Sequence, residues 1–293
     1  MNVMERTVVL LSLLICPQSG FCAEPINVWP DLAPGETTNN IGEVLPFRSA
    51  EQPRVTRVTG ITCPTFTVHP ANNPNGSAAV ILPGGGFRKV VPDKEGTEAA
   101  EWLNNLGITA FVVSYRTTDK PTISDWRKPL QDAQRTLSLV RDEASRWGLD
   151  RERIGLIGFS AGGQVAARLL SDTENRLYER IDHIDDVPYR PDFSVLVYPW
   201  KIYDADRDSL SEGIMVTENN PPTFIVHTDD DASSSVGAAL YYAGLRKQQI
   251  SAELHVYGNG GHGYGLRPVP GSQISSWPDH AAHWLATQQL LNH

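Results

Sequence analysis

The stretch Arg153-Ile-Gly-Leu-Ile-Gly-Phe-Ser160-Ala-Gly-Gly163 carries the pattern that decides the fold. Its first part is a short apolar run typical of a buried strand, and the residues after the serine begin a segment with helical character. Gly158 and Gly162 stand two positions before and after Ser160, where the lack of a Cβ atom allows a sharp turn and close approach of neighbouring backbone. The alternative is an ordinary glycine-rich turn. A strand, a tight turn and a helix in this order favour an exposed nucleophilic serine.

Strands and helices alternate on both sides of this turn. Short β-rich runs predict strands at Thr65–His69, Ala78–Leu82, Thr109–Tyr115, Arg153–Gly158, Phe193–Tyr198, Thr223–His227 and Glu253–Tyr257. Helical patterns predict helices at Gly96–Leu106, Pro129–Trp147, Ala161–Leu170, Val236–Lys247 and Pro278–Leu291. The alternation predicts an α/β fold, in which helices cover both faces of a mostly parallel central sheet. The polar stretches Ser171–Arg190 and Lys201–Asn220 predict loops or a minimal cap.

The beginning of the chain has a different character. An apolar run from Val8 to Ile15, followed by residues up to Ala23, predicts a signal peptide over residues 1–23 and a secreted or periplasmic mature protein. That run is too short to span a bilayer, and no later segment is long enough. Residues 24–62 are rich in Pro, Gly, Asn and Thr and predict an extended N-terminal arm. Residues 63–293 form one predicted catalytic domain, in which Cys63 is the single cysteine, so no internal disulfide is expected.

Charge argues against nucleic acid as a partner. The chain has 25 basic and 34 acidic side chains, a formal net charge of −9, and no basic block that could follow a phosphate backbone.

A metal site is the competing use for Asp229–Asp231 with His227 or His262, but no two-histidine helical motif accompanies them. We therefore expect no metal and no cofactor.

A second glycine-rich loop follows the predicted strand Ala78–Leu82. It reads Pro83-Gly-Gly-Gly-Phe87, and its free backbone N–H groups can point into the space above the end of the sheet. Donors placed there stabilise the anion that forms when a carbonyl group is attacked. Gly85 and Gly86, with the N–H of Ala161, are the candidate oxyanion hole. A plain turn is one alternative, and a phosphate-binding loop is another, although the G-K-[ST] ending is missing.

An acid and a histidine follow two later predicted strands. The strand Thr223–His227 leads into Thr228-Asp-Asp-Asp231, and the strand Glu253–Tyr257 leads into a glycine-rich loop that contains His262. Serine, acid and histidine then occur in the order Ser160, Asp230 and His262, which is the order that α/β-hydrolases use. His227 also ends a strand, but we expect it to pack beneath the site. In the predicted mechanism His262 is the general base, Asp230 orients it, and an acyl-enzyme forms on Ser160.

The chain resembles bacterial α/β-hydrolases of the acetyl-xylan-esterase-like kind, some of which carry a xylanase-related label. The shared segments include Trp29-Pro-Asp-Leu-Ala-Pro-Gly35, Pro83–Phe87, Asp93-Lys-Glu-Gly96, Pro129–Arg135, Arg153–Gly163, Arg190-Pro-Asp-Phe193 and Gly260-Gly-His-Gly-Tyr-Gly265. The resemblance implies the α/β-hydrolase fold and removal of small acyl groups, typically acetyl, from hemicellulose sugars or their oligomers. The implied partner is thus a small-molecule, oligosaccharide or polysaccharide ester.

This chain departs from the family pattern beside the acid. The family continues with Asp-Asp-x-Val-Pro and an Asn-Ser pair, whereas this sequence has Asp230-Asp-Ala-Ser-Ser-Ser-Val236. Alignment from His227 puts the acid at Asp230, and Asp229 and Asp231 stay open.

Tryptophans in loops are candidates for sugar contacts. Trp126 and Trp200 can reach the rim of the site, where an aromatic face would stack on a sugar ring, or they can simply pack. Only a short polar segment separates Phe193–Tyr198 from Thr223–His227, so an open cleft and a short acyl group are expected. The main competing function is that of a general short-chain carboxylesterase. A peptidase of the same fold, a glycosidase and a catalytically silent binding protein fit the sequence less well.

Overall fold

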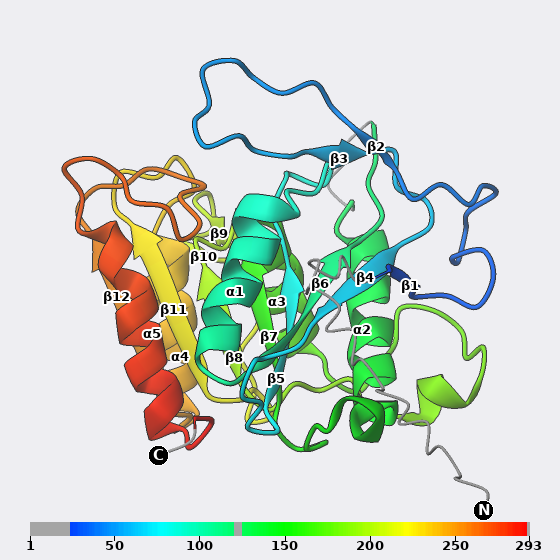
Figure 1. The fold of residues 1–293 in the computed structure, drawn as a ribbon. Helices are drawn as coiled ribbons and strands as arrows, with labels where there is room; N and C mark the ends of the chain where they lie inside the picture. The colour runs from blue at the N-terminus through cyan, green and yellow to red at the C-terminus, as the bar shows by residue number, and fades with distance from the viewer. Residues whose placement is uncertain (1–23, 120–124, 292–293) are drawn as a thin grey trace, which may run out of the picture.

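An eight-stranded sheet runs through the computed structural model, which describes residues 24–119 and 125–291 (Figure 1). The order across the sheet is β1-β4-β6-β5-β7-β8-β11-β12. The strands are β1 (Ile26–Asn27), β4 (Thr65–His69), β6 (Thr109–Ser114), β5 (Ala78–Leu82), β7 (Ile154–Phe159), β8 (Ser194–Val197), β11 (Thr223–Thr228) and β12 (Ala252–Tyr257). β1 and β4 are antiparallel to their neighbours, and the pairs from β6 to β12 are parallel. The mostly parallel sheet predicted from the sequence is confirmed.

Helices cover both faces of the sheet. α1 (Glu98–Asn105) and α5 (Trp277–Thr287) lie on one face, in front of the strands in Figure 1. α2 (Arg127–Asp142), α3 (Ala161–Ser171) and α4 (Val236–Lys247) lie on the other. Successive residues of β5 alternate between the two cores, because side chains of a strand point to opposite faces. Every residue of β5 is therefore buried.

Two predicted helices differ in form from the structure. The segment predicted as Gly96–Leu106 begins earlier, with a π-helical turn at Asp93–Thr97 before α1. The wider turn buries Glu95, whose side chain reaches the loop at Gly84. The segment predicted as Pro129–Trp147 divides into α2 and a short 3₁₀ turn at Ala144–Trp147.

The N-terminal arm is anchored by buried polar contacts. Trp29 Nε1 donates a hydrogen bond to Asp132 Oδ1 at 2.8 Å, and Asp132 also pairs with the buried Arg116. Arg116 in turn donates to the carbonyl of Pro34 at 2.7 Å. Because Trp29 and Pro34 of the arm bind these buried charged groups, the cluster holds the arm against α2. The signal peptide predicted for residues 1–23 lies outside the described residues, and the division between arm and catalytic domain stays a prediction.

The arm also lies beside the carboxyl ends of the parallel strands (Figure 1). The short strands β2 (Glu43–Val44) and β3 (Val58–Thr59) pair with each other. The loop between them extends above α1 in Figure 1, toward the loops that follow β12. This loop takes the position that a cap would occupy. The segment between β8 and β11, for which the sequence predicted loops or a minimal cap, holds only the short hairpin β9 (Tyr203–Asp204) and β10 (Ser209–Leu210).

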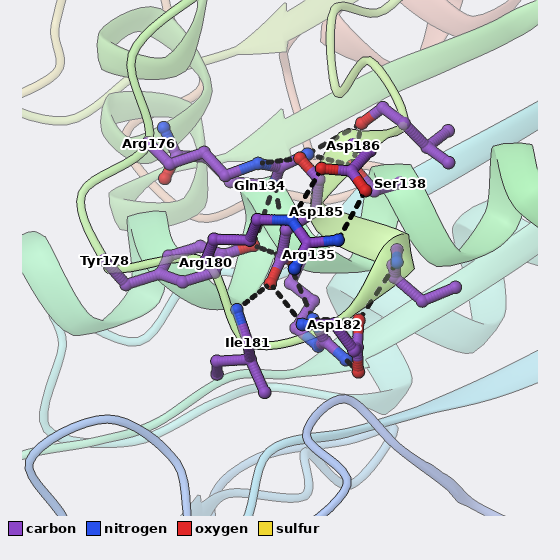
Figure 2. Close-up of polar contacts among 12 residues, drawn as sticks. Gln134, Arg135, Ser138, Arg176, Tyr178, Arg180, Ile181, Asp182, Asp185 and Asp186 are labelled. Carbon is purple, nitrogen blue, oxygen red and sulfur yellow. Dashed lines mark hydrogen bonds and ion pairs between the residues drawn. The ribbon is translucent and has the colours of Figure 1, made fainter.

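An ion-pair network fixes the segment between α3 and β8 onto α2 (Figure 2). Arg135 of α2 is buried and pairs with Asp182 at 2.6 Å and with Asp185 at 2.8 Å. Tyr178 also donates to Asp185, and Arg176 donates to Ser138 at 2.8 Å. The predicted loop Ser171–Arg190 thus has fixed polar contacts, and it includes the 3₁₀ turn His183–Asp186.

Candidate active site

Ser160 stands at the turn between β7 and α3, as the sequence predicted. Its backbone φ is +52°, a value rare for residues other than glycine, and its N–H donates to Val197 O at 3.0 Å. The flanking positions require glycine because neighbouring backbone atoms lie too close to leave room for a Cβ atom. A Cβ atom on Gly158 would lie 2.6 Å from Gly162 O, and one on Gly162 would lie 2.0 Å from Leu82 O. The strained turn, which is typical of a nucleophile elbow, therefore depends on both glycines.

The side chains of Ser160, His262 and Asp231 form a continuous hydrogen-bonded chain. Ser160 Oγ lies 2.6 Å from His262 Nε2, and His262 Nδ1 lies 2.6 Å from Asp231 Oδ2. The Asp231 side chain is 1% exposed, and its other oxygen accepts the backbone N–H of Ser233 at 2.7 Å. The three residues come from the ends of β7, β11 and β12, which meet at one edge of a parallel sheet.

Asp230, the acid that the sequence placed beside His262, has a different set of contacts. It is exposed, and its carboxylate accepts the N–H of Gly261 at 2.8 Å and of Gly260 at 3.1 Å. These N–H groups, that of Gly261 foremost, lower the pKa of its carboxyl group. The sequence assignment is thus corrected by one residue to Asp231, one of the positions left open. The turn at Asp229 and Asp230 that follows β11 decides which carboxylate faces His262.

His227 packs beneath the site, as expected. Its Nδ1 accepts the N–H of Thr228 at 3.0 Å, and it lies 3.9 Å from Asp231 Oδ2. Burial, its largest influence, lowers the pKa of its imidazole. The contact of Asp231 Oδ2 with His262 Nδ1, at 2.6 Å, is much shorter than its contact with His227.

The loop at residues 84–86 brings backbone N–H groups to Ser160. The N–H of Gly84 is already used, because it donates to Glu95 Oε2 at 2.7 Å. The N–H groups of Gly85, Gly86 and Ala161 have no acceptor in the part of the chain that the structure describes. Gly85 has a φ of +138°, and a Cβ atom there would lie 2.0 Å from Lys89 O. Gly85 and Gly86 line the same cavity as Ser160 and can donate to a ligand there.

Glu95 and Tyr198 were not assigned a role from the sequence, and both support the site. Glu95 is 5% exposed and accepts hydrogen bonds from Gly84 N–H and from Tyr198 Oη at 2.8 Å. Burial, against these hydrogen bonds, raises the pKa of its carboxyl group. The Tyr198 ring lies edge-on to His262 at 5.0 Å, and its hydroxyl accepts the N–H of Gly265 at 2.9 Å. Glu95 therefore connects the glycine loop to the loop that carries His262. The segment Asp93-Lys-Glu-Gly96, which the chain shares with the family it resembles, was the signal for Glu95 in the sequence.

A cavity of about 940 Å³ opens over Ser160 and His262. Trp200 lines it, as expected, and packs edge-on against Phe87. Trp126 is not among the residues that line it, and its ring instead packs against the Arg168 guanidinium at 4.2 Å. Part of the wall comes from residues 48–57 of the arm, which the sequence did not predict.

Two further properties concern only residues 24–119 and 125–291. Within them, no group of three or more His, Cys, Asp or Glu side chains is arranged to hold a metal ion. None of their helices combines the length and apolar character needed to cross a bilayer.

Known proteins resemble this chain in both sequence and fold. The BD-FAE family model matches residues 68–197. Acetylxylan esterase from Xylanibacter ruminicola is 30% identical over 218 residues, which cover 66% of this chain and 42% of that protein. Endo-1,4-beta-xylanase B from Butyrivibrio fibrisolvens is 29% identical over 203 residues, which cover 63% of this chain and 32% of that protein. The matched region is therefore less than half the length of either relative.

A solved structure matches over nearly the whole chain. The acetyl ester-xyloside bifunctional hydrolase from Caldicellulosiruptor lactoaceticus is 26% identical with a TM-score of 0.71, and the match covers 94% of this chain and 100% of that one. The sheet order, the strained serine turn and these similarities lead to one conclusion: the chain has the α/β-hydrolase fold.

Proposed function

We propose that this chain is a serine esterase that removes short acyl groups, such as acetyl, from carbohydrate esters. The observation that carries the proposal is the pair of 2.6 Å contacts that join Ser160 to His262 and His262 to Asp231 at the cavity. A serine hydroxyl is a weak nucleophile until a neighbouring base accepts its proton. The carboxylate holds the imidazole in the tautomer that can do so.

The reaction would proceed in two half-cycles. Ser160 Oγ attacks the ester carbonyl carbon while His262 Nε2 accepts its proton, and Asp231 stabilises the imidazolium that forms. When the tetrahedral intermediate collapses, His262 gives that proton to the leaving sugar oxygen, and the acyl group stays on Ser160. Water then attacks the acyl-enzyme while His262 accepts its proton, and His262 gives that proton to Ser160 Oγ as the bond to the acyl carbon breaks and the free acid leaves.

Backbone donors would stabilise the negative charge of both intermediates. The N–H groups of Gly85, Gly86 and Ala161 have no acceptor of their own among the described residues, and the two glycines line the cavity. Glu95 supports this role, because its bond to Gly84 N–H fixes the loop immediately before these donors. Donors held in place in this way need no reorganisation during the reaction.

The names of the relatives support a sugar ester as substrate. One is an acetylxylan esterase and another an acetyl ester-xyloside bifunctional hydrolase, and both names mention an acetyl group and a xylose-based sugar. The cavity is much larger than an acetyl group, and Trp200 in its wall offers a face for a sugar ring. A xylan-type substrate lies outside the cell, so we also propose export through the predicted signal peptide.

The test compares wild type with Ser160→Ala on four substrates: p-nitrophenyl acetate, acetylated xylan, unacetylated xylan and a peptide amide. The proposal expects hydrolysis of the first two by wild type alone. Activity on p-nitrophenyl acetate without release of acetate from xylan would favour a general carboxylesterase. Cleavage of unacetylated xylan or of the peptide would contradict the proposal and favour a glycosidase or a peptidase.

A further inference from the structure

The wall of the cavity is positively charged, although the whole chain has a net charge of −9. Its charged side chains are five cations, Arg48, Arg57, Lys89, Lys94 and Arg267, against the two anions Glu51 and Glu95. An excess of positive charge in a concave site raises the local concentration of anions. These cations therefore influence which substrate the cavity binds.

Part of this charge is already neutralised inside the protein. Glu51 binds Arg57 through two hydrogen bonds of 2.6 and 2.7 Å, and the more exposed Arg48 lies 3.3 Å from the same carboxylate. Arg267 pairs with Glu98 at 2.6 Å. Arg48 and Arg57 together keep one positive charge that Glu51 does not offset, and the rest of the positive charge lies on the two lysines.

Lys89 and Lys94 have no anionic partner for their ammonium groups. Neither Nζ makes a hydrogen bond or an ion pair with any residue that the structure describes. Both side chains are partly buried. Burial lowers the pKa of the Lys89 ammonium group, and the nearby guanidinium groups of Arg48, Arg57 and Arg88 lower it further. Glu51 acts on Lys89 in the opposite direction, and Glu95 foremost does so on Lys94, but among the described residues neither carboxylate forms an ion pair with these ammonium groups.

The two lysines line the cavity beside different loops of the site. A Cβ atom on Gly85 of the glycine loop would lie 3.1 Å from Lys89 Cγ. A Cβ atom on Gly265, in the loop that carries His262, would lie 3.2 Å from Lys94 Cγ. Each lysine stem thus starts beside one of the two loops that would hold the reacting ester.

We infer that Lys89 and Lys94 form an anion-binding subsite, and that the ester substrate carries a carboxylate close to its reacting acyl group. This inference rests on the proposed esterase function. The carboxylate fits best on the sugar, as in an acetylated uronic acid, because the cavity is large enough for a sugar ring and is lined by Trp200. A carboxylate on the acyl group, as in a succinyl ester, has the same chemistry and is separated from it by the test.

The experiment uses two matched pairs of substrates. The first pair is a methyl glucuronoside and a methyl glucoside that carry acetyl on the same hydroxyl and differ only in the carboxylate. The second pair is p-nitrophenyl hemisuccinate and p-nitrophenyl butyrate, which place the carboxylate on the acyl side. The readout is the ratio of kcat/KM within each pair, so that a general effect of a substitution cancels. Inhibition constants of the unacetylated glucuronoside and glucoside measure the subsite without any ester chemistry.

For wild type at low salt we expect the acetylated glucuronoside to exceed the glucoside by about tenfold in kcat/KM, with the advantage shrinking as salt screens the charges. In the Lys89→Gln, Lys94→Gln double variant the ratio should fall to near one. Lys247→Gln is the matched control, because this lysine is exposed at the end of α4 and does not line the cavity. If the kcat/KM ratio of hemisuccinate to butyrate is larger than the ratio of glucuronoside to glucoside, the carboxylate belongs on the acyl group. That result would overturn the uronic acid assignment.

Equal kcat/KM for both members of both pairs, or a tenfold ratio kept in the double variant, would overturn the subsite. If no ester is cleaved at all, the esterase proposal fails and inhibition constants cannot be measured. Binding of the unacetylated glucuronoside and glucoside is then measured by displacement of a competing ligand. Tighter binding of the glucuronoside than of the glucoside, lost in the double variant, would then support the subsite alone. Equal binding of the two sugars would refute it.

Discussion

Replacing Asp231 by asparagine should lower kcat by about 10³ to 10⁴, while the fold stays intact. The hydrogen bond from Ser233 N–H to Asp231 Oδ1, at 2.7 Å, determines how the new amide must lie. The amide oxygen will keep that bond, so the NH₂ group will stand where Oδ2 now accepts from His262 Nδ1 at 2.6 Å. Nδ1 must then become an acceptor, and the ring proton moves to Nε2. A histidine protonated at Nε2 cannot accept the proton of Ser160.

That loss corresponds to about 4 to 5.5 kcal/mol in activation free energy, at 1.36 kcal/mol for each tenfold change in rate. Asp230→Asn is the matched control, because it makes the same change one residue earlier on an exposed side chain. Its amide oxygen can still accept one of the N–H groups of Gly260 and Gly261, so kcat should fall less than tenfold. The assay is p-nitrophenyl acetate hydrolysis at saturating substrate, with circular dichroism to check folding. A loss of 10³ in Asp230→Asn beside near-normal Asp231→Asn would refute the reasoning.

Four further outcomes are expected. A fluorophosphonate probe should label Ser160 alone, as read by peptide mass spectrometry, and labelling undiminished in Ser160→Ala would exclude it as the nucleophile. On p-nitrophenyl esters kcat/KM should peak at acetate or propionate, whereas a maximum at octanoate would reveal a buried acyl tunnel that gains ~0.8 kcal/mol for each methylene. Burial raises the pKa of Glu95 above its ordinary value of 4.5, so the folded state binds the carboxyl proton more tightly than the unfolded chain does. The stability that Glu95 contributes is therefore largest below pH 4.5, and it falls as the pH rises through the folded-state pKa. The free energy of unfolding of wild type relative to Glu95→Gln, from urea titrations between pH 4 and 8, should thus decrease with pH, and a constant difference would contradict this account. Asp132→Ala should lower the free energy of unfolding by about 3–5 kcal/mol because it removes the closer carboxylate from the buried Arg116 and leaves only Glu36 at 3.6 Å, and a loss below 1 kcal/mol would contradict this role of the cluster.

Seven of the eight strands of the sheet were predictable because their signals are local, whereas β1 lies in the segment predicted as an extended arm. The runs at Thr65–His69 and Ala78–Leu82 match β4 and β5 residue for residue, and the other five predicted strands differ by at most one residue at either end. Strands buried on both faces are continuous apolar runs, and loop residues interrupt the sequence clearly between them. The serine turn was equally evident, because its two glycines are demanded by contacts within a few residues and with the adjacent strand.

The rest of the site depends on contacts between distant segments. Three consecutive aspartates follow β11, and only the path of the turn determines that Asp231 rather than Asp230 reaches His262. Trp126 and Trp200 look alike as loop residues, yet one packs on Arg168 and the other lines the cavity. Glu95 is an acidic residue at the start of a helical segment, which usually indicates exposure, and its burial follows from the π-helical turn. No local pattern distinguishes the aspartates or the tryptophans, and only the shared segment Asp93-Lys-Glu-Gly96 pointed to Glu95.

The cavity wall formed by residues 48–57 has a consequence for how substrate preference can change. This stretch contains no strand of the main sheet, and Arg267 holds it by donating to the carbonyls of Pro53 and Arg54. Ser160, His262 and Asp231 instead stand on the strand ends. The reacting side chains and this part of the cavity wall are thus encoded in separate parts of the gene. Exchanging one short surface stretch is therefore a practical route to redesigning selectivity, because the rate-determining geometry need not be altered.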